Sequence, residues 1–218
     1  MKTKASKIFT VSLIASSFLI SFYFFPKLPS QIPTHWNFQG NADQYSPKTF
    51  GVLFLPILQV GIYLLFQTLP LIDPKKKNYQ LFKTEWIKIQ IVILSFFTYM
   101  HFITLTAARN QNLNVSRYVF VGIGLLLVTL GYYLKDVKQN FFIGIRTPWT
   151  ISNQKVWKNT HIFASKAYII TGLVTVCTSP FVLSINPAYI FLALLSGSLS
   201  PVLYSYYSYR QITQHNKK

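Results

Sequence analysis

The chain contains six apolar stretches that are each long enough to cross a lipid bilayer. A helix that spans the hydrocarbon core of a membrane needs about 20 mainly apolar residues. Charged residues make up only 11% of the chain, compared with about 25% in soluble domains, so they cannot cover a water-soluble surface. We therefore predict an all-α integral membrane protein, a bundle of six transmembrane helices in contact with the lipid bilayer. The predicted spans are 8–25, 50–72, 86–108, 118–134, 167–185 and 188–207.

Basic residues are distributed unevenly between the connections. Of the 21 Lys and Arg residues, all but Lys27, Lys48, Arg109 and Arg117 lie at the two ends of the chain, in the second and fourth connections or at the start of the third span. Basic connections stay in the cytoplasm, so both termini are predicted to be cytoplasmic. Membrane topology then accounts for the net charge of +17, and no direct nucleic-acid partner is predicted.

The spans pair naturally into three units. We expect an N-terminal two-span unit (1–72) that carries the first external loop, a central two-span unit (73–134), and a C-terminal unit (135–218) with a cytoplasmic loop and a two-span hairpin. Because a Pro follows the first apolar stretch and no small-residue cleavage site is present, this stretch is predicted to be an uncleaved span. The single cysteine excludes an internal disulfide and a Cys-based zinc site.

The first external loop (28–48) is predicted to be a structured cap. Three prolines restrict its backbone, and Gly40 and Asn41 can adopt positive φ angles. Its polar and aromatic side chains can either face a ligand that arrives from outside, or anchor the loop at the interface and bond within it. One His and one Asp are too few for a metal site. The candidate residues are His35, Trp36, Asn37, Gly40 and Asp43.

A dense motif occupies 140–157, where a mere connector would need only polar turn residues. Gly144 permits a sharp turn, and we expect Ser152 to cap a helix that starts at the next residue. Trp157 and His161 would share one face of that helix. Arg146 can bind a carboxylate or a phosphate, stack on an aromatic ring, or clamp the loop to carbonyl groups. The candidate residues are Asn140, Gly144, Arg146, Thr147, Pro148, Trp149, Trp157 and His161.

Four polar residues are predicted to lie within the spans. Gln59, Tyr63, Gln90 and His101 can either line a path or hydrogen-bond between helices. The four acidic residues all lie in connections or at span ends, which argues against a proton-coupled pump and against a hydrolase with paired carboxylates. Nucleotide-binding, metalloprotease and serine-hydrolase motifs are absent from the sequence. We therefore predict no catalytic residue, no cofactor and no enzymatic activity.

Two motifs resemble those of the SdpI family of bacterial membrane proteins. The stretch Gly144-Ile-Arg-Thr-Pro-Trp-Thr150, followed by Val156-Trp157, is similar to the signature of that family's C-terminal half. The stretch Ile32-Pro-Thr-His-Trp36, followed by Gly40, is similar to an uncharacterised domain at the N-terminus of the same proteins. The resemblance covers nearly the whole chain and includes the six-span layout. Arg146, Pro148, Trp149 and Trp157 are its motif positions.

The resemblance implies an immunity protein in the cytoplasmic membrane of a Gram-positive bacterium. Such a protein protects a toxin-producing cell from its own secreted antimicrobial peptide. It also implies a receptor that holds a cytosolic transcriptional repressor at the membrane. Two other functions stay open on the residues alone. One is a transporter of a hydrophobic or peptide substrate past Gln59, Gln90 and His101, and the other is a lipid-acting enzyme that uses His35 or His161.

Overall fold

The computed structural model describes residues 3–37, 39–110, 113–182 and 184–215. Six of its helices are long and apolar enough to cross a membrane, so the predicted multi-pass, mainly helical architecture is confirmed. These helices are α1 (Thr3–Phe24), α2 (Lys48–Ile72), α3 (Lys83–Arg109), α4 (Val115–Leu134), α6 (Gln154–Thr178) and α7 (Pro187–His215).

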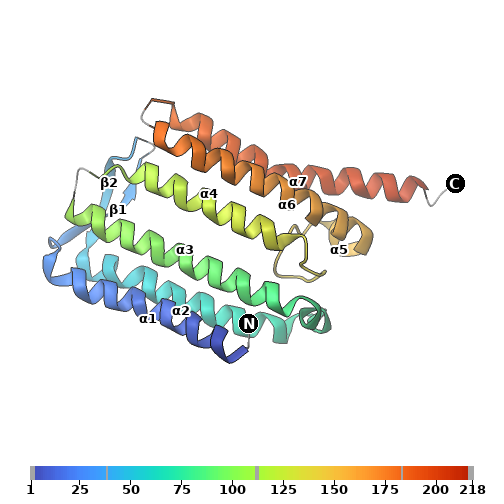
Figure 1. Cartoon of the computed structure of the whole chain (residues 1–218), viewed down its shortest axis with the longest axis horizontal. Helices are drawn as coiled ribbons and strands as arrows, with labels where there is room; N and C mark the ends of the chain where they lie inside the picture. Colours follow the sequence, from blue (N-terminus) through green and yellow to red (C-terminus); the bar gives the residue numbers. More distant parts are fainter. Residues whose placement is uncertain (1–2, 38, 111–112, 183, 216–218) are drawn as a thin grey trace.

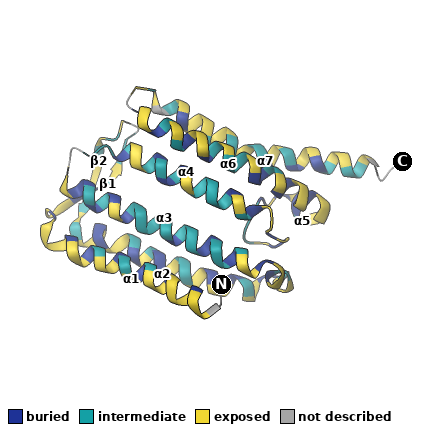
Figure 2. Ribbon diagram, viewed as in Figure 1, coloured by how far each residue is buried: buried dark blue, intermediate teal, exposed yellow. Residues whose placement is uncertain are grey.

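The helices form two groups of three. α1, α2 and α3 pack together, α6 packs against both α4 and α7, and contact between α3 and α4 joins the two groups. Exposed positions are spread along all six long helices (Figure 2), and many of them carry large apolar side chains. Phe22 is 83% exposed and Leu203 is 75% exposed, as expected for side chains that face lipid rather than water.

The two ends of the bundle differ in structure. α1 begins and α7 ends at one end, beside the short helix α5 (Pro148–Ser152) (Figure 1). A hairpin of β1 (Gln31–Trp36) and β2 (Ala42–Pro47) covers the other end. We call these the inner end and the outer end. α4, at 20 residues, is about 30 Å long, which sets the distance between them.

The α4–α6 contact depends on two glycines. A Cβ atom on Gly172 would lie only 2.5 Å from the carbonyl oxygen of Gly124, and a Cβ on Gly124 would lie 2.7 Å from that of Gly172. Either addition would push the helices apart. Small residues allow helix backbones to approach closely within a bilayer, where lipid removes the hydrophobic drive for association.

The outer loop is a structured cap, as predicted, but its two strands were not foreseen. Gly40, with φ +84°, forms the turn between them. Ile32 fastens the hairpin to the bundle, since its side chain is fully buried against Gly51. A Cβ on Gly51 would lie 2.4 Å from Ile32 Cδ1. The hairpin therefore sits directly on the first turn of α2.

The fifth span differs from the prediction. α6 runs from Gln154 to Thr178, whereas the apolar pattern predicted 167–185. Hydropathy alone placed the start of the span at 167 because Lys155 and Lys158 interrupt the apolar pattern, whereas the helix expected from Asn153 is present within one residue. The helix stops early because Pro180, in the 3₁₀ turn Ser179–Phe181, cannot supply the next backbone hydrogen bond. The predicted cap was wrong too: Asn153 caps α6 by accepting hydrogen bonds from the Lys155 and Val156 N–H groups.

Candidate functional site

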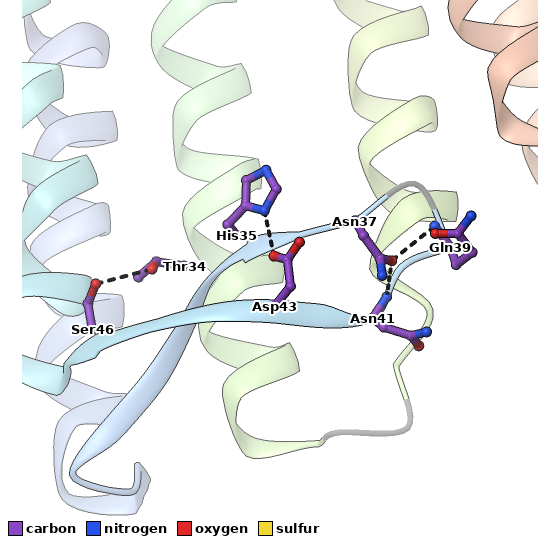
Figure 3. A network of polar contacts seen from close by, with 7 residues as sticks. All are labelled: Thr34, His35, Asn37, Gln39, Asn41, Asp43 and Ser46. Carbon is purple, nitrogen blue, oxygen red and sulfur yellow. Dashed lines mark hydrogen bonds and ion pairs between the residues drawn. The ribbon is translucent and has the colours of Figure 1, made fainter.

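The hairpin brings His35 and Asp43 together at the outer end. His35 Nδ1 lies 2.5 Å from Asp43 Oδ1, and Figure 3 shows the two side chains pointing toward one another from neighbouring strands. The strand register is irregular here, since His35 pairs with Gln44 and Trp36 pairs with Ala42. Asp43 is thus an extra residue in β2, and such bulges redirect side chains.

The hairpin turn is held by Asn37. Its Oδ1 accepts hydrogen bonds from the N–H groups of Gln39 and Asn41, both at 3.0 Å (Figure 3). Gly40 lies against α4, where a Cβ atom would come within 3.0 Å of Ser116 Oγ. Trp36 packs against a small apolar cluster at the α3–α4 junction. All five outer candidates therefore lie in one structural unit.

An apolar cleft opens beneath this hairpin. It has a volume of about 770 Å³ and lies between α3, α4 and α7, with His35, Trp36 and Asn37 at its outer edge. Aromatic and aliphatic side chains form its walls. They include Phe96, Phe97 and Met100 of α3, Val119 and Phe120 of α4, and Phe191 and Leu194 of α7. The cleft can accept an apolar molecule and presents a few polar groups at its mouth.

At the inner end, Gly144 packs directly against His161, and the ring of His161 bonds to the backbone of the next residue, Ile145. We call this arrangement the inner lock. Gly144 has φ +114°, and a Cβ atom there would lie 2.3 Å from His161 Nε2. His161 is fully buried. Its Nε2 accepts the Ile145 N–H at 3.1 Å, and its Nδ1 lies 2.8 Å from the Trp157 carbonyl oxygen. A donor on one side and an acceptor on the other fix the neutral Nδ1–H tautomer.

Trp157 joins the same lock, as its spacing from His161 predicted. The two rings stack with centroids 4.1 Å apart and an interplanar angle of 18°. The indole Nε1–H donates to the Val137 carbonyl at 2.9 Å. The first two turns of α6 therefore hold both arms of the 135–153 loop.

The remaining inner candidates shape this loop. Asn140 is buried and folds the backbone around itself, since its Oδ1 accepts the Phe142 and Ile143 N–H groups. Thr147 caps α5 reciprocally with Thr150, and Pro148 takes the first helical position, where no N–H is needed. Two contacts reach α7: Thr147 Oγ1 lies 3.0 Å from Ser205 Oγ, and Trp149 packs on Tyr206 at 5.0 Å.

Arg146 lies on the exposed face of the lock. Its Nη1 donates to the Phe141 carbonyl at 2.7 Å, so it clamps the loop. Its guanidinium forms no ion pair with a carboxylate in the part of the chain that the structure describes. One edge of the group holds the loop while the side chain stays exposed, which leaves a planar cation at the inner surface.

The sequence did not identify Asp73, which is central to the inner end. It is 2% exposed. Its carboxylate accepts the Lys75 N–H at 2.6 Å, the Tyr79 hydroxyl at 2.8 Å and the Phe141 N–H at 2.9 Å. Gln139 adds further ties to Lys75, Asn78 and the carbonyls of Thr150 and Ile151. One signal was present: Asp73 is one of only four acidic residues, and a single proline separates it from three consecutive lysines.

The polar residues inside the spans separate into two places. Gln59 and His101 are fully buried in a network with α1: Gln59 Nε2 donates to Ser17 Oγ at 2.8 Å, and His101 Nε2 lies 2.8 Å from Ser21 Oγ. Tyr63 and Gln90 instead line a cleft at the inner end. Within the described residues, no three His, Cys, Asp or Glu side chains group closely enough to hold a metal ion.

Comparisons with known proteins agree with the two motifs. Residues 136–205 match the model of the SdpI/YfhL protein family, and residues 12–60 match a domain of unknown function, DUF1648. The chain is 27% identical over 212 residues to Immunity protein SdpI of Bacillus subtilis (strain 168), covering 94% of this chain and 96% of that protein. No solved structure is significantly similar to it. The match over residues 136–205 and the similarity over most of the chain confirm the predicted resemblance to the SdpI family.

Proposed function

We propose that this chain is a membrane immunity protein that protects its cell against a secreted antimicrobial peptide. The observation that carries the proposal is similarity over 94% of the chain to a protein named Immunity protein SdpI. The similarity extends over most of the chain, so the compared segment includes the residues of both the outer hairpin and the inner lock.

In this proposal the outer cleft is where the toxin is met. Membrane-active peptides carry an apolar face, which suits walls built from Phe96, Phe97 and Phe191. His35 and Asp43 place one polar pair at the mouth, where a peptide would leave water. The outer end faces outside the cell in this proposal, because the basic connections gather at the inner end. The same reasoning favours cytoplasmic termini, and the proposed Gram-positive host follows the similarity to a protein of Bacillus subtilis.

The inner lock is the proposed contact for a cytosolic repressor. The 135–153 loop is rigidly folded, so it presents a fixed surface and loses little entropy on binding. Arg146 supplies an exposed planar cation at that surface. Cationic surfaces of this kind select acidic partners, and arginine is well suited to carboxylates.

A survival assay tests the immunity proposal. A sensitive Gram-positive strain that expresses the chain is challenged with a secreted antimicrobial peptide, beside cells with an empty vector. We expect protection by the wild type, reduced by Val119→Phe, which fills the outer cleft. Val174→Phe makes the same chemical change on the exposed face of α6 and should still protect. No protection by wild-type protein that has reached the membrane would reject the proposal for that toxin.

The role of the inner surface in immunity is tested separately. Arg146→Ala should leave the protein in the membrane, because Arg146 is exposed and contributes one loop hydrogen bond. If the inner surface takes part in immunity, this variant loses protection, whereas Lys158→Ala on the nearby exposed surface of α6 does not. If both variants protect fully, the inner surface has no role in resistance to the toxin.

Transport is the competing proposal. Its path would pass Gln59, Gln90 and His101, yet Gln59 and His101 are fully buried and bonded to neighbouring helices. This arrangement favours a static, stabilising role. Substrate flux into proteoliposomes that falls on Gln59→Leu would favour transport instead.

A further inference from the structure

A second cleft lies at the inner end between α1, α2 and α3, and the proposed function does not use it. Its volume is about 580 Å³. Three lysines line it: Lys4 and Lys7 from the first turns of α1 and Lys83 from the start of α3. No carboxylate is among the described residues that line it. The three ammonium groups therefore repel one another without a neutralising partner in the protein.

Two buried polar groups on the walls of this cleft lack partners. Ser6 is 2% exposed and Gln90 is 4% exposed, and neither Ser6 Oγ nor Gln90 Nε2 forms a hydrogen bond in the described structure. Buried polar groups are nearly always bonded, and leaving one unpaired is costly. Both groups can donate a hydrogen bond, so the cleft offers donors and positive charge to an oxygen-rich anion.

Asp73, which bonds to a residue that lines the cleft, does not supply that anion. Tyr79 also lines the cleft, but its hydroxyl already donates to Asp73. The Asp73 carboxylate is in turn engaged by the backbone N–H groups of Lys75 and Phe141. The Asp73 carboxylate therefore stabilises the inner connections and does not pair with the lysines of the cleft.

Part of the remaining wall is apolar, and Thr10, Tyr63, Gln67 and Gln80 add further polar groups to it. Pro70, Trp86 and Ile87 line the cleft beside the lysines. A ligand that fits both parts carries an anionic oxygen group and a hydrocarbon chain. Lysines at span ends commonly extend toward lipid headgroups without any specific site. Here, however, they share one cleft with two buried donors, which general attraction to the interface does not explain.

We propose that this cleft binds the phosphate-bearing headgroup of an anionic phospholipid. The phosphate oxygens would accept from Gln90 Nε2 and Ser6 Oγ and neutralise the lysines, and the first acyl carbons would lie along Trp86 and Ile87. Basic pockets between transmembrane helices bind such headgroups in other membrane proteins. The inference is independent of the immunity proposal, because it uses no residue of the outer cleft or the lock.

Native mass spectrometry of the full chain in detergent tests this. The delipidated protein is titrated with phosphatidylglycerol or with phosphatidylcholine of the same acyl chains. We expect the first phosphatidylglycerol to bind at least tenfold more tightly. The triple variant Lys4→Gln, Lys7→Gln, Lys83→Gln should lose that preference, since each lysine contributes about fivefold near a charged headgroup. Because these lysines are exposed, the variant should fold.

The matched control removes the same three charges outside the cleft. Lys155, Lys158 and Lys166 are exposed on α6, and their replacement by Gln should keep the preference. Gln90→Leu should weaken phosphatidylglycerol binding about fivefold, yet leave melting in lipid-free detergent unchanged or higher. The proposal is overturned if wild type shows no preference, or if the control variant loses as much as the cleft variant. Displacement of the lipid by an equal concentration of soluble glycerol phosphate would overturn its assignment to a lipid.

Discussion

The inner lock predicts a large penalty for one added methyl group at Gly144. In Gly144→Ala the backbone must hold a non-glycine residue at φ +114°, which costs about 1–3 kcal/mol. The new Cβ would also lie 2.3 Å from His161 Nε2, so the imidazole must move. Moving it breaks the bond to Ile145 N–H and leaves a buried donor unpaired, at a further cost of about 1–3 kcal/mol. We expect a total loss of about 2–6 kcal/mol in the free energy of unfolding.

Reversible unfolding in mixed detergent micelles measures this loss, and a double-mutant cycle separates its two parts. In a His161→Ala background the clash is gone, so Gly144→Ala should cost only the backbone strain. The coupling energy between the two positions should then be about 1–3 kcal/mol. Gly40→Ala is the matched control, with φ +84° and Ser116 Oγ at 3.0 Å from the new Cβ. It should cost about 1–2 kcal/mol, mostly strain.

Two results would refute this reasoning. One is a loss below about 1 kcal/mol for Gly144→Ala, which would mean that the loop relaxes around the methyl group. The other is full additivity with His161→Ala, which would mean that the imidazole does not oppose the methyl group. Either result would leave Gly144 as an ordinary turn glycine.

Three further substitutions test the inner connections and the span network by unfolding in the same micelles. Asp73→Asn should destabilise the protein by about 1–3 kcal/mol. The new amide nitrogen would face at least one of the three groups that donate to the carboxylate, the Lys75 N–H, the Tyr79 hydroxyl and the Phe141 N–H. An unchanged stability would mean that water replaces the lost acceptor. Trp157→Phe should lower the free energy of unfolding by about 1 kcal/mol, because the Val137 carbonyl loses its hydrogen-bond donor. This loss should exceed that of Trp149→Phe, which removes only ring contact with Tyr206. Gln59→Leu should lower the free energy of unfolding by no more than about 1 kcal/mol. Its partners Ser17 and Thr98 also donate to backbone carbonyls in their own helices and so keep a hydrogen bond. A larger loss would show that the hydrogen bonds among Ser17, Gln59 and Thr98 stabilise one another.

The sequence predicts the spans well because lipid imposes one simple rule. Any segment of about 20 apolar residues must form a helix to satisfy its backbone. The rule misplaces a span boundary where the helix carries charge at its end, which is why hydropathy placed the fifth span at 167 although α6 begins at Gln154. The capping pattern, and not hydropathy, predicted a helix from 153. The rule also gives no information on the hairpin. Both strands contain proline, at Pro33 and Pro47, a residue that usually marks the absence of a strand.

The candidate site was predictable only where partners are close in sequence. Trp157 and His161 are four residues apart, so helix geometry alone places their rings together. Asp73 and Phe141 are 68 residues apart, and their contact depends on how the helices are arranged. Apolar spans do not encode that arrangement in their periodicity, because lipid-facing and core-facing positions are both apolar. The hydrogen bonds that join Asp73 to Phe141, and Lys75 and Asn78 to Gln139, could therefore not be predicted from the sequence.

The connections between the two helix groups differ at the two ends of the bundle. At the inner end, three side-chain hydrogen bonds join 73–78 to 139–141, whereas at the outer end an apolar cleft of about 770 Å³ lies between α3, α4 and α7.

A link from toxin outside to partner inside needs two arrangements of the bundle that bind the toxin with different affinity. Two of the three inner bonds involve a charged group and are worth about 1.5–3 kcal/mol each. Breaking all three would cost more than the roughly 1–3 kcal/mol by which one bound ligand usually alters another's affinity. If the proposed function includes such a link, we expect a toxin in the outer cleft to tilt the two helix groups about an intact inner connection rather than to open it.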